Sequence, residues 1–159
     1  MERKDNHKPY ILVSACLLGS KVRYDGKSKP YPGIERLTEY FNVIPVCPEC
    51  QGGLPIPRAP SEIISGEKVM SKDGKDVSEN YRIGAEETLK IAERFHPLFC
   101  ILKERSPSCG TSWIHDGSFT DKVIPGQGIT TRLLQAHGYD VYPEDKIPSI
   151  IEHYKEEQE

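Results

Sequence analysis

Two cysteines and a carboxylate lie close together in a stretch rich in glycine and proline. Residues 46–60 read VCPECQGGLPIPRAP and contain Cys47, Glu49 and Cys50. Glycine loosens the backbone and proline removes a hydrogen-bond donor, which predicts a loop without long regular structure. Loops that a rigid scaffold holds often carry function. We therefore interpret this stretch as one wall of a functional site.

The remaining cysteines are Cys16, Cys100 and Cys109, which brings the total to five. The N-terminal residues are polar and lead into only a short apolar run, so neither a signal peptide nor a membrane span is expected. We expect a cytoplasmic protein. In a reducing compartment, an odd number of cysteines is more typical of metal ligands or reactive thiols than of a disulfide framework.

Strands and helices are predicted to alternate along the chain. Apolar runs typical of buried strands occur at residues 10–15, 43–46, 98–102 and 139–142. Apolar residues at helical spacing occur at residues 34–41, 78–95, 129–137 and 147–154. Turn signals predict two small hairpins, at residues 62–77 and 113–123.

This order predicts an α/β fold, a three-layer sandwich in which helices cover both faces of a mostly parallel sheet of about four strands. We expect a polar N-terminal arm over residues 1–9 and a single domain over residues 10–159. Three details are more specific. Pro45 lacks a ladder donor and is awkward in a central strand. Ser78 is predicted to be an N-cap, and the last helix is expected to fray after Tyr154.

Three of the thiols follow predicted strands. In parallel sheets, ligands bind outside the carboxyl ends of the strands, so Cys16, Cys47 and Cys109 should gather at one edge. Cys100 lies inside a strand and is expected to pack as a small apolar residue. Soft thiolates select zinc, copper(I) or iron-sulfur clusters, and three of them leave one coordination position open.

The cysteines also allow other interpretations. Cys50 or His115 could complete a closed zinc site. All five thiols could instead be buried packing residues. A redox use of Cys47 with Cys50 requires a helix that opens at the motif, which the following glycines and prolines disfavour.

Three motifs, in order along the chain, resemble the domain-of-unknown-function 523 family, which includes the thiouracil desulfurases. The motifs are SACLLG at 14–19 with YDG at 24–26, CPE at 47–49 leading to GGLPIPR at 52–58, and SPSCG at 106–110. The resemblance spans residues 10 to 142.

The resemblance implies a [4Fe-4S] cluster held by Cys16, Cys47 and Cys109. Its fourth iron would accept the sulfur that leaves a thiolated pyrimidine, without net redox change. Cys50 departs from the family pattern, and a thiol there could bind the fourth iron and close the site. We expect a small thiolated molecule as the substrate. The net charge of -3 disfavours nucleic acid as a partner but does not exclude thiolated RNA.

Four residues near these motifs are candidates for substrate chemistry. Glu49 could act as a general acid or base if burial raised its pKa from about 4.3, or it could accept backbone N–H groups of the loop. Ser106 is assigned a catalytic role and Ser108 a substrate-binding role, although small polar residues also stabilise turns. Arg58 could bind an anionic group of the substrate or fix the loop by pairing with Glu62.

Two functions of different classes follow. The first is an iron-sulfur-dependent desulfurase that acts on a thiouracil-like pyrimidine or a similar thioamide. The second is a zinc- or ligand-binding protein in which Cys16, Cys47, Cys50 and Cys109 form a closed site without catalysis.

Overall fold

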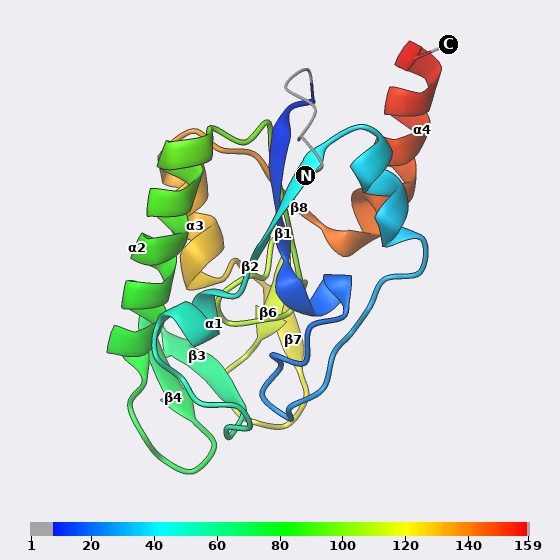
Figure 1. Cartoon of the computed structure of the whole chain (residues 1–159). Coiled ribbons are helices and arrows are strands. Elements are labelled where there is room, and N and C mark those ends of the chain that lie inside the picture. Colours follow the sequence, from blue (N-terminus) through cyan, green and yellow to red (C-terminus); the bar gives the residue numbers. More distant parts are fainter. Residues whose placement is uncertain (1–7, 159) are drawn as a thin grey trace.

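A four-stranded parallel sheet occupies the centre of the computed structural model, which describes residues 8–158 (Figure 1). Its strands, in spatial order, are β2 (Asn42–Val46), β1 (Tyr10–Ser14), β5 (Cys100–Leu102) and β8 (Val141–Pro143). All three pairings are parallel. The predicted α/β sandwich is therefore confirmed. Residues 1–7 of the predicted N-terminal arm lie outside the described residues.

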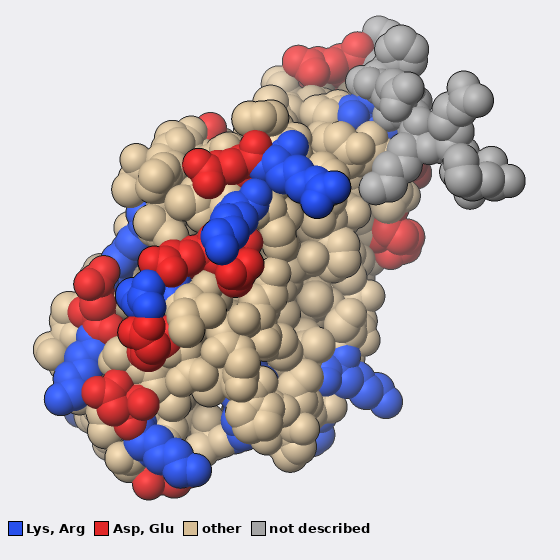
Figure 2. Space-filling model, turned by 60° about the vertical axis from the view of Figure 1, so that its left-hand side comes forward, with Lys and Arg blue, Asp and Glu red and all other residues tan. Residues whose placement is uncertain are grey.

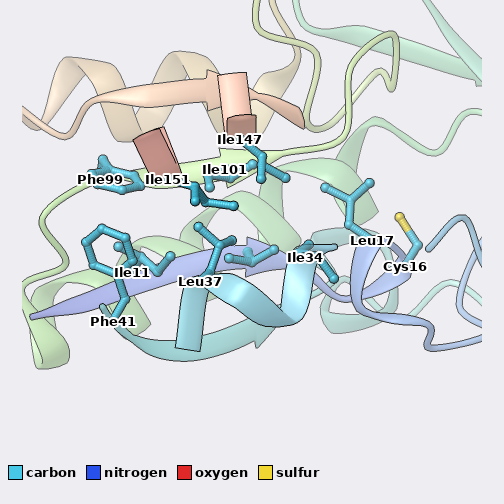
Figure 3. Packing of buried hydrophobic residues seen from close by; sticks show 11 residues of the cluster. Ile11, Cys16, Leu17, Ile34, Leu37, Phe41, Phe99, Ile101, Ile147 and Ile151 are labelled. Carbon is cyan, nitrogen blue, oxygen red and sulfur yellow. The ribbon is translucent and has the colours of Figure 1, made fainter. Parts of the chain in front are cut away.

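Side chains of successive strand residues point to opposite faces, and each face is covered by different helices. One face packs Ile11 and Val13 against the 3-10 helix η2 (Ile34–Glu39) and the helix α4 (Ile147–Gln158). Figure 3 shows Ile34 and Leu37 of η2 opposite Ile147 and Ile151 of α4, with Cys16 at one end of this cluster.

The opposite face packs against two other helices. Leu12 and Cys100 lie there with residues of α2 (Ser78–Phe95) and α3 (Ile129–Ala136). Cys100 is fully buried, and burial raises its pKa to about 12. The prediction that Cys100 is a packing residue is confirmed.

Two antiparallel hairpins lie beyond the carboxyl ends of the strands, at the bottom of Figure 1. They pair β3 (Ser61–Ser65) with β4 (Lys68–Ser71), and β6 (Trp113–His115) with β7 (Val123–Pro125). Both were predicted. Ile63, Val69 and Ile114 join these hairpins to α2 in a third apolar cluster.

Some local predictions were wrong. Residues 34–39 form a 3-10 helix instead of the expected α-helix, and α4 continues through Gln158 instead of fraying after Tyr154. Ser78 is the first residue of α2 and does not cap it. Its hydroxyl instead accepts a hydrogen bond of 2.8 Å from the N–H of Val69, which ties α2 to β4.

Strand β2 is at the edge of the sheet and is only half-buried, in contrast to the buried strand predicted. Pro45 is exposed there. An edge position explains how the strand tolerates Pro45, because an edge strand needs ladder donors on one side only.

The outer surface of α2 carries acidic and basic side chains. Figure 2 brings this side of the molecule forward and shows the two charges alternating over it. Arg82 pairs with Glu79 and Glu86, and Lys90 pairs with Glu87. Exposed pairs of this kind contribute little to stability. Among the described residues, no helix is long and apolar enough to cross a membrane.

Candidate active site

A cavity of about 550 Å³ lies at the carboxyl ends of β1, β2 and β5. The chain order of the strands reverses between β1 and β5, which is where ligands bind in open α/β sheets. Cys16, Cys47 and Cys109 all line this cavity. The gathering of the three thiols is therefore observed, although each comes from a different loop.

Burial raises the pKa of all three thiols. Burial raises the pKa of Cys47 to about 12. Burial also raises the pKa of Cys16, and the positive charges of Lys103 and Arg23 oppose part of this increase. The pKa of Cys109 is raised well above its usual range by burial, and further by the charges of Glu49, Cys47 and Cys16. Three thiolates in this cavity would therefore need a cationic group between them. An iron-sulfur cluster fits this donor set because its irons bind soft sulfur ligands and supply that charge.

Cys50 lies beside Cys47 and outside the cavity lining. Its thiol lies 3.9 Å from the carbonyl oxygen of Val22, to which it donates, and it also hydrogen-bonds with Cys47. Within residues 8–158, no three His, Cys, Asp or Glu side chains are arranged to hold a single metal ion. The geometry thus gives no support to a closed zinc site with Cys50 or His115. A four-iron cluster is wider than one ion, so its ligands need to surround a cavity, as these three do.

A one-turn helix that the sequence did not predict carries the Cys47 motif. Helix α1 spans Pro48–Gln51, with Cys47 at its N-cap and Pro48 in the first turn, where a missing N–H costs nothing. The expectation that no helix opens at this motif was wrong. The helix does not make Cys47 acidic, because the effect of burial on its pKa dominates.

Two glycines allow α1 to lie directly against α2. A Cβ atom at Gly52 would lie 1.9 Å from the carbonyl oxygen of Asn80, and one at Gly84 would lie 2.0 Å from that of Pro48. The amide of Asn80 donates a 2.8 Å hydrogen bond to the carbonyl of Gly52 across this crossing. The backbones approach as closely as they do because neither contact residue has a side chain.

This crossing places Glu49 among three polar side chains. The hydroxyl of Tyr81 donates a 2.7 Å hydrogen bond to Oε2 of Glu49, and Nη2 of Arg58 lies 3.5 Å from the same oxygen. The hydroxyl of Ser106 lies 3.5 Å from Oε1, at the outer limit of a hydrogen bond. The carboxylate thus contacts side chains instead of the backbone N–H groups that were the alternative prediction. Glu49 and Ser106 both line the cavity.

Ser106 and Ser108 have different surroundings. Oγ of Ser106 accepts hydrogen bonds from the N–H groups of Ser108 at 3.0 Å and Cys109 at 3.1 Å. Ser108 is fully buried, its hydroxyl lies 2.7 Å from that of Thr130, and it does not line the cavity. This position does not support the substrate-binding role predicted for Ser108, and it gives the residue a part in fixing the loop to α3.

Arg58 lines the cavity, and it pairs with Glu49 instead of with Glu62, the partner in one of its two predicted roles. Its guanidinium pairs with Glu49 and donates to the carbonyl oxygens of Val22 and Pro55, both at 3.1 Å. Its Nε atom is buried and has no hydrogen-bond partner among residues 8–158. Glu62 instead accepts the N–H of Gly117 at 2.9 Å, in the β6–β7 turn. The Glu62 contact joins residues 55 positions apart, a separation that hid this pairing from sequence reasoning.

Sequence reasoning missed two residues that shape the site. Tyr81 was assigned only to the apolar positions of its helix. Glu104 carried no motif, yet its carboxylate accepts the N–H groups of Thr111 at 2.8 Å and of Ser112 and Trp113 at 3.1 Å. These hydrogen bonds fold the loop that presents Ser106 and Cys109. Its place two residues after a buried strand was the one available signal.

Comparison with known proteins agrees with this site. A family model described as 2-thiouracil desulfurase matches residues 11–146. A protein of Bacillus subtilis (strain 168), the uncharacterized protein YbbK, is 39% identical over 150 residues, which cover 89% of this chain and 99% of that protein. The solved structure of the [4Fe-4S]-dependent thiouracil desulfidase TudS matches with a TM-score of 0.85 and 41% identity, over 93% of this chain and 99% of that chain. The chain therefore belongs to the 2-thiouracil desulfurase family.

Proposed function

We propose that this protein removes sulfur from a thiouracil-like pyrimidine or a similar thioamide, with a [4Fe-4S] cluster held by Cys16, Cys47 and Cys109. Membership of the family makes the chain an enzyme of the thiouracil desulfurase type. The observation that carries the proposal is the convergence of three thiols and Glu49 on one cavity. The description of TudS as [4Fe-4S]-dependent supports the choice of cofactor.

The reaction exchanges the sulfur of a thiocarbonyl group for the oxygen of water, and it releases sulfide without a change in oxidation state. When bound, the cluster would supply a Lewis acid for the soft sulfur. Glu49 would take a proton from the attacking water and return it as the sulfur leaves. Its position supports this role, because Arg58 and Tyr81 hold one carboxylate oxygen and leave the other directed toward Ser106.

The hydroxyl of Ser106 is suited to act as a donor. Its oxygen already accepts two backbone N–H groups, so its own hydrogen is the group that remains available. That hydrogen can point to Glu49 or to a substrate in the cavity. Ser106 would therefore orient the water or the substrate. Arg58, which lines the cavity, would present its guanidinium to an acceptor on the substrate.

Anaerobic reconstitution and a sulfide assay test this function. Protein reconstituted without oxygen should contain about four iron and four acid-labile sulfide per chain and release sulfide from a thiouracil. Cys109→Ala should lose both the cluster and sulfide release. Cys100→Ala, which also removes a buried thiol but lies inside β5, is the matched control and should keep both. A Cys109→Ala variant that still releases sulfide at the normal rate would exclude the proposed ligand set.

A further inference from the structure

Tyr81 is the most buried of the side chains that contact Glu49. It is 1% exposed, and its ring packs among Val77, Ala85 and Ile129 in the apolar cluster beneath the hairpins. Only its hydroxyl reaches the polar site, where it lies 2.7 Å from Oε2 of Glu49. A phenylalanine at this position would pack equally well, so packing does not explain why the side chain carries a hydroxyl group.

The direction of this hydrogen bond follows from the two groups. An ionised carboxylate can only accept, so the phenol O–H of Tyr81 donates to Oε2 of Glu49. Burial, together with the charge of Glu49, raises the pKa of Tyr81 well above its usual range, so the phenol remains a donor at all working pH values.

The two oxygens of the Glu49 carboxylate are distinguished by these contacts. Oε2 faces Tyr81 and Arg58, while Oε1 faces Ser106. The ion pair with Arg58 does not fix the orientation of the carboxylate by itself. Nη2 of Arg58 lies 3.5 Å from Oε2 of Glu49, so the pair stabilises the negative charge without a short, directional hydrogen bond. The short bond from a rigid, buried ring adds the missing constraint. Rotation of the carboxylate away from this orientation would break the bond from Tyr81 and turn Oε1 away from Ser106.

We propose that Tyr81 is a positioning residue that holds the Glu49 carboxylate in its reactive orientation. The proposal rests on the proposed function, because it assigns Tyr81 a role in the step that Glu49 carries out. Tyr81 itself does not line the cavity, so it acts on the substrate only through Glu49.

The test compares Tyr81→Phe with Thr88→Val in reconstituted enzyme. Thr88 is also fully buried on α2, and its hydroxyl bonds to Gln51 of α1 and to the carbonyl of Gly84 instead of to Glu49. We expect Tyr81→Phe to keep its cluster spectrum and KM and to lose about 10- to 100-fold in kcat, the scale of a misplaced catalytic group. Thr88→Val should keep kcat. If both variants lost kcat equally, helix packing would be the cause and the positioning role would be overturned.

A double-mutant cycle with Glu49→Ala gives a second readout that does not depend on activity. In cluster-free protein, the stability losses of Tyr81→Phe and Glu49→Ala should not add, because each removes the same hydrogen bond. Additive losses would overturn the proposal. The two proposals also fail differently: wild-type enzyme that releases no sulfide overturns the function and the positioning together, whereas an active wild type matched by Tyr81→Phe overturns the positioning alone.

Discussion

Replacement of Gly84 by alanine is the most direct test of how the fold positions the site. In an ordinary helix interior this change stabilises by about 1 kcal/mol, because alanine restricts the unfolded chain and favours the helix. Here the new Cβ atom would lie 2.0 Å from the carbonyl oxygen of Pro48 and 2.8 Å from its carbon. Real Cβ contacts are essentially never shorter than 3.0 Å, so α1 must move by at least the difference, 3.0 minus 2.0 Å.

The cost of that movement can be estimated. Both sides of the contact are backbone, so no flexible side chain can relieve it, and overpacking should cost close to 3 kcal/mol, the upper end of its usual range. Subtracting the helix propensity gain of about 1 kcal/mol leaves a net loss of about 2 kcal/mol. For a domain of this size, that loss lowers Tm by roughly 4–8 °C.

Thermal unfolding of cluster-free protein measures this loss. Glu93→Ala, an exposed substitution on the same helix, is the control and should change stability by less than about 0.5 kcal/mol. In reconstituted enzyme, Gly84→Ala should also lower sulfide release by about 100-fold, because α1 carries Glu49 and has Cys47 as its N-cap. A Gly84→Ala protein as stable as wild type, or more stable, would refute the argument that the two backbones are in contact.

Three further predictions concern the loops around the cavity. Burial raises the pKa of Glu104, but hydrogen bonds from Thr111, Ser112 and Trp113 outweigh burial and lower it. Glu104 therefore stabilises the folded state at pH values above its unfolded pKa of about 4.3. This contribution disappears as the pH falls through the lower pKa of the folded state. Glu104→Gln should therefore lose roughly 1–3 kcal/mol at pH 7 in urea unfolding, and the difference from wild type should vanish in acid; a pH-independent difference would contradict this. Arg58→Met should lose roughly 3 kcal/mol, because it leaves Glu49 buried without its cation, and an unchanged urea midpoint would show that the pair contributes nothing. Cys50→Ala should retain iron, acid-labile sulfide and sulfide release, whereas loss of iron would identify Cys50 as a ligand.

The central strands could be predicted because consecutive apolar residues indicate a buried strand. Runs such as Tyr10–Ser14 can be recognised without their partners, and the two hairpins could be predicted from the turn pairs Ser65-Gly66 and Asp116-Gly117. The shorter elements depend on tertiary contacts. Helix α1 has only four residues and exists because Gly52 and Gly84 let it lie against α2. Strand β2 is at the edge, a position that local sequence does not encode.

In the candidate site, too, local sequence indicated some residues, whereas others depend on tertiary contacts. The thiols could be placed because each follows a strand, and Glu49 because it lies two residues from Cys47. Its partners could not be placed. Tyr81 is 32 residues away from Glu49 and occupies an apolar position of an amphipathic helix, where the sequence indicates packing. Ser108 stands next to Cys109, yet its side chain turns to Thr130, because neighbours in a tight loop face different directions.

A different set of protein contacts positions each of the three cysteines, and each set is made by the protein chain alone. Cys16 lies in the 3-10 helix η1 (Ala15–Leu18), and its carbonyl oxygen accepts hydrogen bonds from the N–H groups of Gly19 at 3.2 Å and Lys29 at 3.0 Å. Cys47 is held by the crossing of α1 with α2, and Cys109 by the hydroxyl of Ser106. Since backbone hydrogen bonds and helix packing fix each loop separately, the donors are ordered by the fold itself. Burial raises the pKa of these thiols, so loss of their protons costs free energy, and the iron cations would offset that cost when the three thiolates bind them.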